Sequence, residues 1–388
     1  MVGAVTSLQP LRIAYVTTYD ARDVHAWSGT GNAIAECLIH AGFELDFVGL
    51  REREPVRFLT RVAKLAYRAA GTELLRDREP LVNKGFAAQA DRRLRSVDHD
   101  IVFSPGTVPV GYLATSKPIV FWTDATFDGM LDYYESFTGL SRRTLRNGHA
   151  LEQNALDRCH LALYSSEWAA NSALELYRVD PRKVHVVPFG ANVSDPPSRD
   201  EVVAAIDDRD PGRCDLLFVG VEWDRKGGEV AVAAAEAMNR AGRPTELHVV
   251  GCVPPRRLPG FVRVHGFISK RDPAGRQRLA ALYARAHFVI GPSKAEAYGL
   301  AFAEACCYGV PVLAADTGGV ATIVRDGVNG HLLPPDPSGD AYAHIALGIM
   351  EDPNEYRRLA LGARREYETR LNWGAAGARV RQLITAHI

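Results

Sequence analysis

The fold is decided by the stretch His287-Phe-Val-Ile-Gly-Pro-Ser-Lys-Ala-Glu-Ala-Tyr-Gly-Leu-Ala-Phe-Ala-Glu304. Its first part is a short apolar run bounded by glycine and proline, which is typical of a strand buried in a parallel sheet. A short loop follows, and a helical pattern begins at Gly299 or Leu300. The stretch therefore predicts a strand, a loop and a helix, which is the repeating unit of a parallel α/β sheet.

The same alternation extends in both directions from this stretch. In the first half of the chain, strand-like apolar runs fall at 11–17, 43–50, 101–104, 119–123, 161–165 and 184–188. In the second half they fall at 215–220, 247–251, 262–265, 287–291, 310–315 and 331–333. Helical patterns separate them, so the sequence predicts an α/β fold with doubly wound parallel sheets.

The length of 388 residues suggests two domains. We expect an N-terminal Rossmann-like domain over 1–190, a linker over 191–213 and a C-terminal Rossmann-like domain over 214–370, followed by a helical segment over 371–388. Two such domains that face each other leave a cleft between the carboxyl ends of their strands, where such sheets bind ligands.

The overall composition excludes several classes of protein. The number of lysines plus arginines equals the number of aspartates plus glutamates, at 46 each. The formal net charge is therefore zero, and it does not indicate a nucleic-acid partner. No apolar run is long enough for a transmembrane helix, and residues 1–10 lack the pattern of a secretory signal. The six cysteines are scattered, which favours reduced thiols and a cytoplasmic location.

The loop and helix at 292–304 carry the candidate chemistry. Backbone amides at the start of the predicted helix are unpaired and lie at the positive end of its dipole, which suits a pyrophosphate. Gly299 allows close approach of a ligand, and Glu304 lies about one turn into the helix, where its carboxylate can accept hydrogen bonds from ribose hydroxyls. Glu296 in the loop can accept hydrogen bonds from the hydroxyls of a transferred sugar. Taken alone, the two glutamates are better explained as solvent-exposed carboxylates, and it is their sequence context that favours a binding role.

Glu296 and Glu304 stand in the setting Glu-Ala-Tyr-Gly-x4-Glu-Ala, followed by Gly-Val-Pro-Val and Thr-Gly-Gly. This arrangement resembles the donor site of retaining glycosyltransferases of family 4, which have the GT-B fold. Further similarities occur in order at 165–190, 218–227 and 264–269, and Trp373 stands where the terminal helix of that family crosses back toward the N-terminal domain. The C-terminal half resembles the family throughout, and the N-terminal half resembles it in outline.

The resemblance implies roles for further residues of the C-terminal half. Lys226, six residues after Gly220, would neutralise the charge of the leaving nucleoside diphosphate. The family usually has an arginine directly after that glycine, where this chain has Val221, and Arg225 is our candidate for the missing charge. The remaining donor-binding positions implied by the resemblance are Phe267, Ile268, Ala297, Tyr298, Gly299 and Leu300.

In the N-terminal half, Ser-Gly29-Thr-Gly31 resembles the glycine-rich loop beside the donor phosphates, although a plain tight turn explains it as well. The lack of a third glycine and of a ribose-binding acid argues against NAD. Many family members have a histidine at the position of Thr123. Its absence leaves Asp124 as a candidate for polarising an acceptor hydroxyl, with structural capping as the alternative role.

The implied function is metal-independent transfer of a hexose-type sugar, with retention of configuration and front-face attack, from a UDP-, GDP- or ADP-sugar to an unidentified hydroxyl acceptor. We expect no cofactor and no metal. Two Asp-x-Asp strings, at 98–100 and 208–210, lie before a strand and in the linker, away from the strand ends where a metal site is expected. The alternatives are an epimerase or phosphorylase of the same fold and a catalytically degenerate protein that binds sugar nucleotides.

A local excess of basic residues marks the segment 51–95, which has twelve basic and six acidic residues. Arg57, Arg61, Lys64 and Arg68 recur there at helical spacing. Such a face can bind anionic lipid at the inner face of a membrane or a phosphorylated acceptor, and a plain solvated helix face is the alternative.

Overall fold

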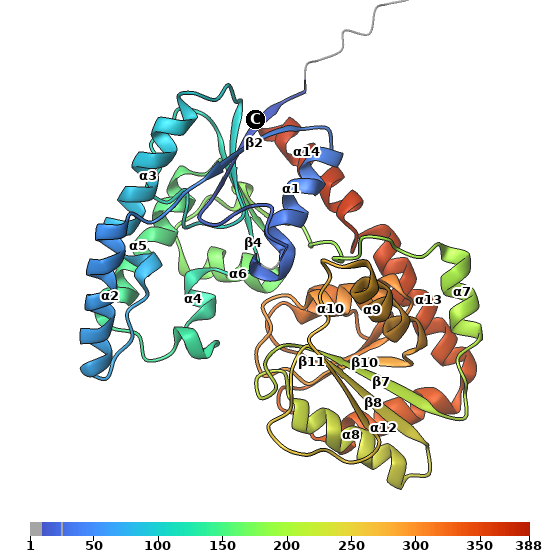
Figure 1. Ribbon diagram of the computed structural model, residues 1–388. Helices are drawn as coiled ribbons and strands as arrows, with labels where there is room; N and C mark the ends of the chain where they lie inside the picture. The colour runs from blue at the N-terminus through green and yellow to red at the C-terminus, as the bar shows by residue number, and fades with distance from the viewer. Residues whose placement is uncertain (1–9, 25) are drawn as a thin grey trace, which may run out of the picture. The chain divides into compact units, whose positions relative to one another are not determined.

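The structure is a computed structural model that describes residues 10–24 and 26–388. Residues 1–9, on which the expectation about a secretory signal rests, lie outside the described residues. The chain divides into two compact units (Figure 1). Unit 1 contains the described residues up to Ser165 together with Ala169–Val187 and Gly377–Ile388, and unit 2 contains Ser166–Trp168 and Pro188–Ala376.

Unit 1 is built on a six-stranded sheet in which every pair of neighbours is parallel. The order across the sheet is β2-β1-β3-β4-β5-β6. The strands are β1 (Arg12–Thr17), β2 (Glu44–Gly49), β3 (Ile101–Ser104), β4 (Ile119–Thr123), β5 (Leu161–Tyr164) and β6 (Val184–Val186). The three central strands β3, β4 and β5 are buried along their whole length, because helices cover both faces of such a sheet.

The helices of unit 1 fill the connections between these strands. They are α1 (Thr30–His40), α2 (Glu54–Ala69), α3 (Pro80–Leu94), α4 (Phe127–Met130) and α5 (Arg142–Arg158), with 3-10 turns η1 (Ala26–Gly29), η2 (Arg76–Arg78), η3 (Glu135–Phe137) and η4 (Pro181–Lys183). Helices α6 (Glu167–Leu176) and α14 (Trp373–His387) contain residues of both units. The end of α14 packs on α1, where Arg381 donates to the carbonyl of Ala41 over 2.6 Å.

Unit 2 has a second six-stranded parallel sheet with the order β12-β11-β10-β7-β8-β9. Its strands are β7 (Cys214–Val219), β8 (Thr245–Val250), β9 (Val262–Gly266), β10 (Phe288–Gly291), β11 (Val312–Ala315) and β12 (Gly330–Leu333). The chain first extends the sheet from β7 toward β9, then returns to place β10 on the other side of β7. This reversal between β7 and β10 is the topological switch point of unit 2.

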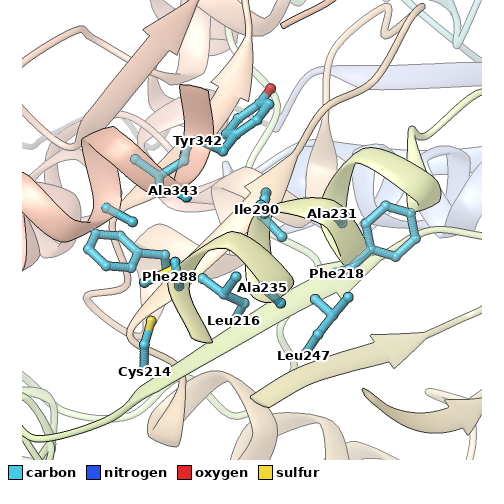
Figure 2. Close-up of a cluster of buried hydrophobic side chains, with 14 of the residues drawn as sticks. Cys214, Leu216, Phe218, Ala231, Ala235, Leu247, Phe288, Ile290, Tyr342 and Ala343 are labelled. Carbon is cyan, nitrogen blue, oxygen red and sulfur yellow. The ribbon is translucent and has the colours of Figure 1, made fainter. Parts of the chain in front are cut away.

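The helices of unit 2 are α7 (Arg199–Asp207), α8 (Gly228–Arg240), α9 (Pro273–Arg285), α10 (Leu300–Cys307), α11 (Val320–Ile323), α12 (Gly339–Glu351) and α13 (Pro353–Thr369). Helices α8 and α12 pack on the sheet, and one buried hydrophobic cluster includes Ala231 and Ala235 of α8, Leu216 and Phe218 of β7, and Tyr342 and Ala343 of α12 (Figure 2). Small residues on α8 let the helix approach the sheet closely. The prediction of an α/β fold with two parallel sheets is confirmed.

The segment 191–213, predicted as a linker, has regular structure of its own and belongs to unit 2. Ser198 and Glu201 form a capping box that starts α7, because each side chain bonds to the backbone amide of the other. Arg209 is buried and donates to the carbonyls of Tyr308 and Gly309. The segment is therefore hydrogen-bonded to the residues that directly follow the carboxyl end of α10.

Two further observations bear on the class of protein. Across the described residues, no helix combines the length and the apolar character needed to cross a bilayer. All six cysteines are described and buried, and no disulfide bond joins any two of them.

Glu152 on α5 is a buried carboxyl group in the core of unit 1, and the hydroxyl of Thr107 donates to it over 2.8 Å. Burial raises the pKa of Glu152 from its ordinary 4.5 to about 7, although the Thr107 hydroxyl and the charge of Arg78 act in the opposite direction. Between about pH 4.5 and about pH 7, the folded state therefore retains a proton that the unfolded state loses.

The free energy of unfolding should fall as pH rises from about 4.5 to about 7, by roughly 2–3 kcal/mol from this one group. Replacing Glu152 with glutamine should remove this loss, because the amide keeps the hydrogen bond from Thr107 and does not ionise. Denaturant unfolding of both proteins across this pH range measures the difference, with exposed Glu175→Gln as the control. A pH profile that Glu152→Gln leaves unchanged would contradict the prediction.

Candidate functional site

Two loops of unit 2 meet at the switch point of its sheet. Residues 220–227 follow β7 and lead into α8, while residues 292–299 follow β10 and lead into α10. β7 and β10 are neighbouring strands, and the carboxyl end of the sheet at such a switch point is where ligands bind in folds of this kind.

The two loops are held against each other by side-chain and backbone hydrogen bonds. The guanidinium of Arg225 donates to the carbonyl of Ala295 over 2.7 Å and to the carboxylate of Glu222 over 2.6 Å. In return, the amide of Lys294 donates to the carbonyl of Arg225 over 2.8 Å. Gly227 has a φ of 76°, and a Cβ on it would lie 2.1 Å from the carbonyl oxygen of Pro292. The switch-point loops therefore form one rigid structure.

Lys226 and Glu296 form an ion pair across this junction. Their side chains are only 15% and 11% exposed, so the pair is sheltered from water. Gly220 makes room for the lysine, because a Cβ there would lie 2.7 Å from Cγ of Lys226. A sheltered cation and a carboxylate thus stand together at the switch point.

Helix α10 begins directly beyond this pair. Its N-cap residue Gly299 has a φ of 100°, a conformation that favours glycine. The first amides of a helix have no acceptor within the helix, and the dipole makes this end positive. The side chain of Tyr298 is buried and donates to the carbonyl of Phe189 over 2.6 Å, so its ring anchors the loop.

A third strand end completes the junction. The Thr-Gly-Gly sequence after β11 places the amide of Gly319 3.0 Å from the carbonyl of Glu296. A Cβ on Gly319 would lie 2.1 Å from the carbonyl oxygen of Ala297, which explains why glycine is needed here.

Glu304 on α10 is almost fully buried and is held by two side chains. One of its oxygens pairs with Lys270, and the other accepts a hydrogen bond of 3.1 Å from Tyr283. A carboxylate offers about four acceptor positions, so two contacts leave capacity for a ligand hydroxyl. Burial raises the pKa of Tyr283 well above its ordinary value, so the phenol remains a donor. Neither Lys270 nor Tyr283 belongs to a recognised motif, so the sequence did not predict their contacts with Glu304.

A cavity of about 220 Å³ lies against Glu304. Its walls include Lys270, Tyr283, Arg276 and the segment 192–195. Complete ligand sites usually exceed about 300 Å³, so this cavity fits part of a ligand. Near it, after β9, Phe267 is 65% exposed while Ile268 is buried. Of these two predicted donor-binding residues, only Phe267 has a side chain that a ligand can reach from solvent.

The predicted residues of the N-terminal half lie in unit 1. Gly31 is the second residue of α1, and a Cβ there would lie 2.2 Å from the hydroxyl of Tyr19. Before it, Trp27, Ser28 and Gly29 all have positive φ, at 48°, 55° and 82°. A positive φ is costly for the non-glycine residues Trp27 and Ser28, so they mark a loop that the surrounding structure constrains.

Asp124, which directly follows β4, contacts this same loop. One oxygen of its carboxylate accepts a hydrogen bond of 3.2 Å from the indole of Trp27. The structure thus brings Asp124 to the glycine-rich loop within unit 1, as it brings Lys226, Arg225 and Glu296 together within unit 2.

The two Asp-x-Asp strings have structural contacts. Both Asp98 and Asp100 bind Arg12 at the start of β1, and Asp210 accepts from the amide of Gly212 over 2.8 Å. A different acidic cluster, Asp215, Glu246 and His248, has its ligand atoms close enough to hold a cation. It lies toward the amino ends of β7 and β8, and three arginines already pair with its carboxylates: Arg213, Arg263 and Arg285. A metal ion would have to displace these arginines.

The family model described as Glycosyltransferase Family 4 matches residues 32–195, and the model described as Glycosyl transferases group 1 matches residues 213–352. The chain belongs to glycosyltransferase family 4. The second match contains both switch-point loops, with Lys226, Glu296 and Glu304.

Relatives and solved structures agree with this family-4 assignment. A D-inositol 3-phosphate glycosyltransferase of Xylanimonas cellulosilytica is 33% identical over 232 residues, which are 55% of this chain and 54% of that protein. The chain thus spans about half the length of the curated relatives it matches.

Sucrose-phosphate synthase from Thermosynechococcus elongatus has a TM-score of 0.70 at 16% identity, covering 97% of this chain and 98% of that one. The Anabaena protein HepE, solved with UDP and glucose, has a TM-score of 0.63 at 15% identity, covering 97% of this chain and 100% of that one. At such identities these likenesses show the fold, which is of the GT-B class.

Proposed function

We propose that this family-4 chain transfers a hexose-type sugar from a nucleoside diphosphate sugar to a hydroxyl acceptor, with retention of configuration and without a metal ion. The observation that carries the proposal is the sheltered Lys226–Glu296 pair at the switch point, directly before the N-terminus of α10. A cation beside free helix amides suits a diphosphate, and a carboxylate beside that cation suits sugar hydroxyls. The Anabaena structures with UDP and with UDP-glucose support a nucleotide sugar as the donor.

In the proposed mechanism, the acceptor hydroxyl attacks the anomeric carbon on the face from which the diphosphate leaves. The diphosphate takes the proton of that hydroxyl, while Lys226 and the first amides of α10 stabilise its growing negative charge. Asp124 of unit 1, whose carboxylate accepts a hydrogen bond from Trp27, would polarise the acceptor hydroxyl. Arg225 would hold the two switch-point loops in place, because its guanidinium donates hydrogen bonds to Glu222 and to the carbonyl of Ala295.

A panel of UDP-, GDP- and ADP-sugars, each with added EDTA, tests the proposal. We expect slow hydrolysis of one donor despite EDTA, together with a rise in the melting temperature of the protein. Binding without hydrolysis or transfer would favour a degenerate sugar-nucleotide-binding protein, and conversion of the donor to another sugar nucleotide would favour an epimerase. If no donor binds, the assignment of the switch-point site fails.

Glu304 should contribute to the affinity for the nucleoside part of the donor. Replacing it with glutamine removes a buried charged acceptor and should weaken binding of the nucleoside diphosphate by about 1.5–3 kcal/mol, measured by titration calorimetry. Glu351→Gln, which changes an exposed carboxylate of α12, is the matched control. Unchanged affinity in Glu304→Gln would assign this carboxylate a purely structural role with Lys270 and Tyr283.

A further inference from the structure

Helix α2 of unit 1 has three distinct faces. Val56, Thr60, Ala63 and Tyr67 recur at helical spacing and are wholly or partly buried, so this row packs on the unit. A second row is apolar and exposed, and a third row is basic. In Figure 1 the helix runs beside α3 at the outside of unit 1.

The apolar row is exposed to an unusual degree for large side chains. The exposed fractions are 67% for Phe58, 58% for Leu59, 50% for Val62 and 67% for Leu65. Single exposed apolar residues are common on protein surfaces, but a contiguous patch rimmed by polar groups marks an interaction site. The row runs from Phe58 to Leu65, so it extends over about 11 Å of the helix axis.

The basic row borders the apolar row along the same helix. It consists of Arg57, Arg61, Lys64 and Arg68, and Glu54 is the one acidic residue among the 16 of the helix. Glu54 pairs with Arg57, and Glu73 beyond the helix lies 3.8 Å from Lys64 and 3.2 Å from Arg68. Since these pairs are solvent-exposed and weak, the row keeps a positive potential.

We propose that α2 lies flat on an anionic lipid bilayer, with its apolar row in the boundary between headgroups and acyl chains and its basic row on the lipid phosphates. This combination of rows is the one that suits an interfacial helix. A second copy of the chain fits less well, because the symmetric contact would bring two basic rows together. All residues of this surface lie in unit 1, and the proposal is independent of the donor site proposed in unit 2.

Flotation with vesicles of phosphatidylglycerol and phosphatidylcholine tests the proposal on the full chain. The protein should float with the mixed vesicles and should bind vesicles of phosphatidylcholine alone much more weakly, and high salt should release it. The variant Phe58→Ser/Leu65→Ser should lose about tenfold or more in affinity. The variant Arg61→Gln/Lys64→Gln should lose about thirtyfold, at about 1 kcal/mol for each cation.

The matched control is Leu174→Ser/Leu176→Ser, which removes two exposed apolar side chains from α6. It should bind like the original protein, and all variants should melt at similar temperatures because the changed residues are exposed. Failure of the original protein to bind anionic vesicles would overturn the proposal. So would equal loss in the control, or a concentration-dependent dimer that only the α2 variants abolish.

A fluorescent label on α2 identifies the inserted face. The native cysteines are buried, so Val62→Cys can be labelled selectively with an environment-sensitive dye. Its emission should shift to the blue on anionic vesicles and should be quenched by nitroxides on the lipid chains. An unchanged emission while the protein floats would place the contact elsewhere and would also overturn the proposal.

Discussion

Replacing Lys226 with alanine is expected to lower kcat about 150-fold, which corresponds to about 3 kcal/mol of lost transition-state stabilisation. In the proposed mechanism the diphosphate gains negative charge as it leaves, and the sheltered ammonium of Lys226 at the switch point would stabilise that charge. Because the interaction strengthens in the transition state, kcat should fall more than KM rises. Steady-state transfer with the donor identified by the panel measures both quantities.

Two variants make the result for Lys226 specific. Lys226→Arg keeps the positive charge and should recover part of the lost rate, whereas Lys117→Ala removes an exposed lysine of unit 1 and should have no effect. Turnover in Lys226→Ala at the original rate would remove this lysine from the mechanism. A large fall in the melting temperature of Lys226→Ala would instead indicate that the ion pair with Glu296 holds the loops together.

Replacing Gly227 with alanine is expected to lower the free energy of unfolding by about 4 kcal/mol, among the largest effects of a single substitution in this chain. Two causes add. The φ of 76° is unfavourable for alanine, and the new Cβ would lie 2.1 Å from the backbone carbonyl oxygen of Pro292. Since a carbonyl in a packed loop cannot move aside cheaply, the two switch-point loops must separate.

Gly242 provides the control for the effect of backbone conformation alone. Its φ is 85°, and a Cβ there would meet nothing within 4 Å. Gly242→Ala should therefore cost only about 1 kcal/mol. Denaturant unfolding measures both variants, and equal costs would show that the close approach to Pro292 is unimportant. Gly227→Ala should also impair transfer, because Arg225 and Lys226 lie on the displaced turn.

The sequence predicted the sheets well because each strand is a short buried run between breakers. The run at 101–104 matches β3, and the run at 119–123 matches β4. For the segment 191–213 the sequence pattern predicts only a linker, although Ser198-Arg-Asp-Glu201 has the spacing of a capping box. Prolines and charges around it obscured that signal, and burial of Arg209 depends on carbonyls about a hundred residues away.

The predicted site rested on motifs and on a family resemblance, and the contacts of its residues depend on the fold. No local pattern predicts that Tyr298 donates to the carbonyl of Phe189, or that Lys270 and Tyr283 hold Glu304. Similarly, the Thr-Gly-Gly motif is visible in the sequence, but the reason for Gly319 is the approach of the Ala297 carbonyl. Contacts between strand ends far apart in the chain can be read only from the structure.

The ion pair between Lys226 and Glu296 has a consequence for how such a site would choose its ligand. Before a donor arrives, each charge is already compensated by the other, so a simple anion such as sulfate gains little by approaching the lysine. A complete sugar nucleotide can satisfy both partners at once, with its phosphates on the cation and its hydroxyls on the carboxylate. After the sugar departs, the carboxylate is again available to compete with the diphosphate for the lysine. The ion pair between these two side chains would thus compete with ligand binding, and this competition would favour binding of the intact donor and release of the nucleoside diphosphate product.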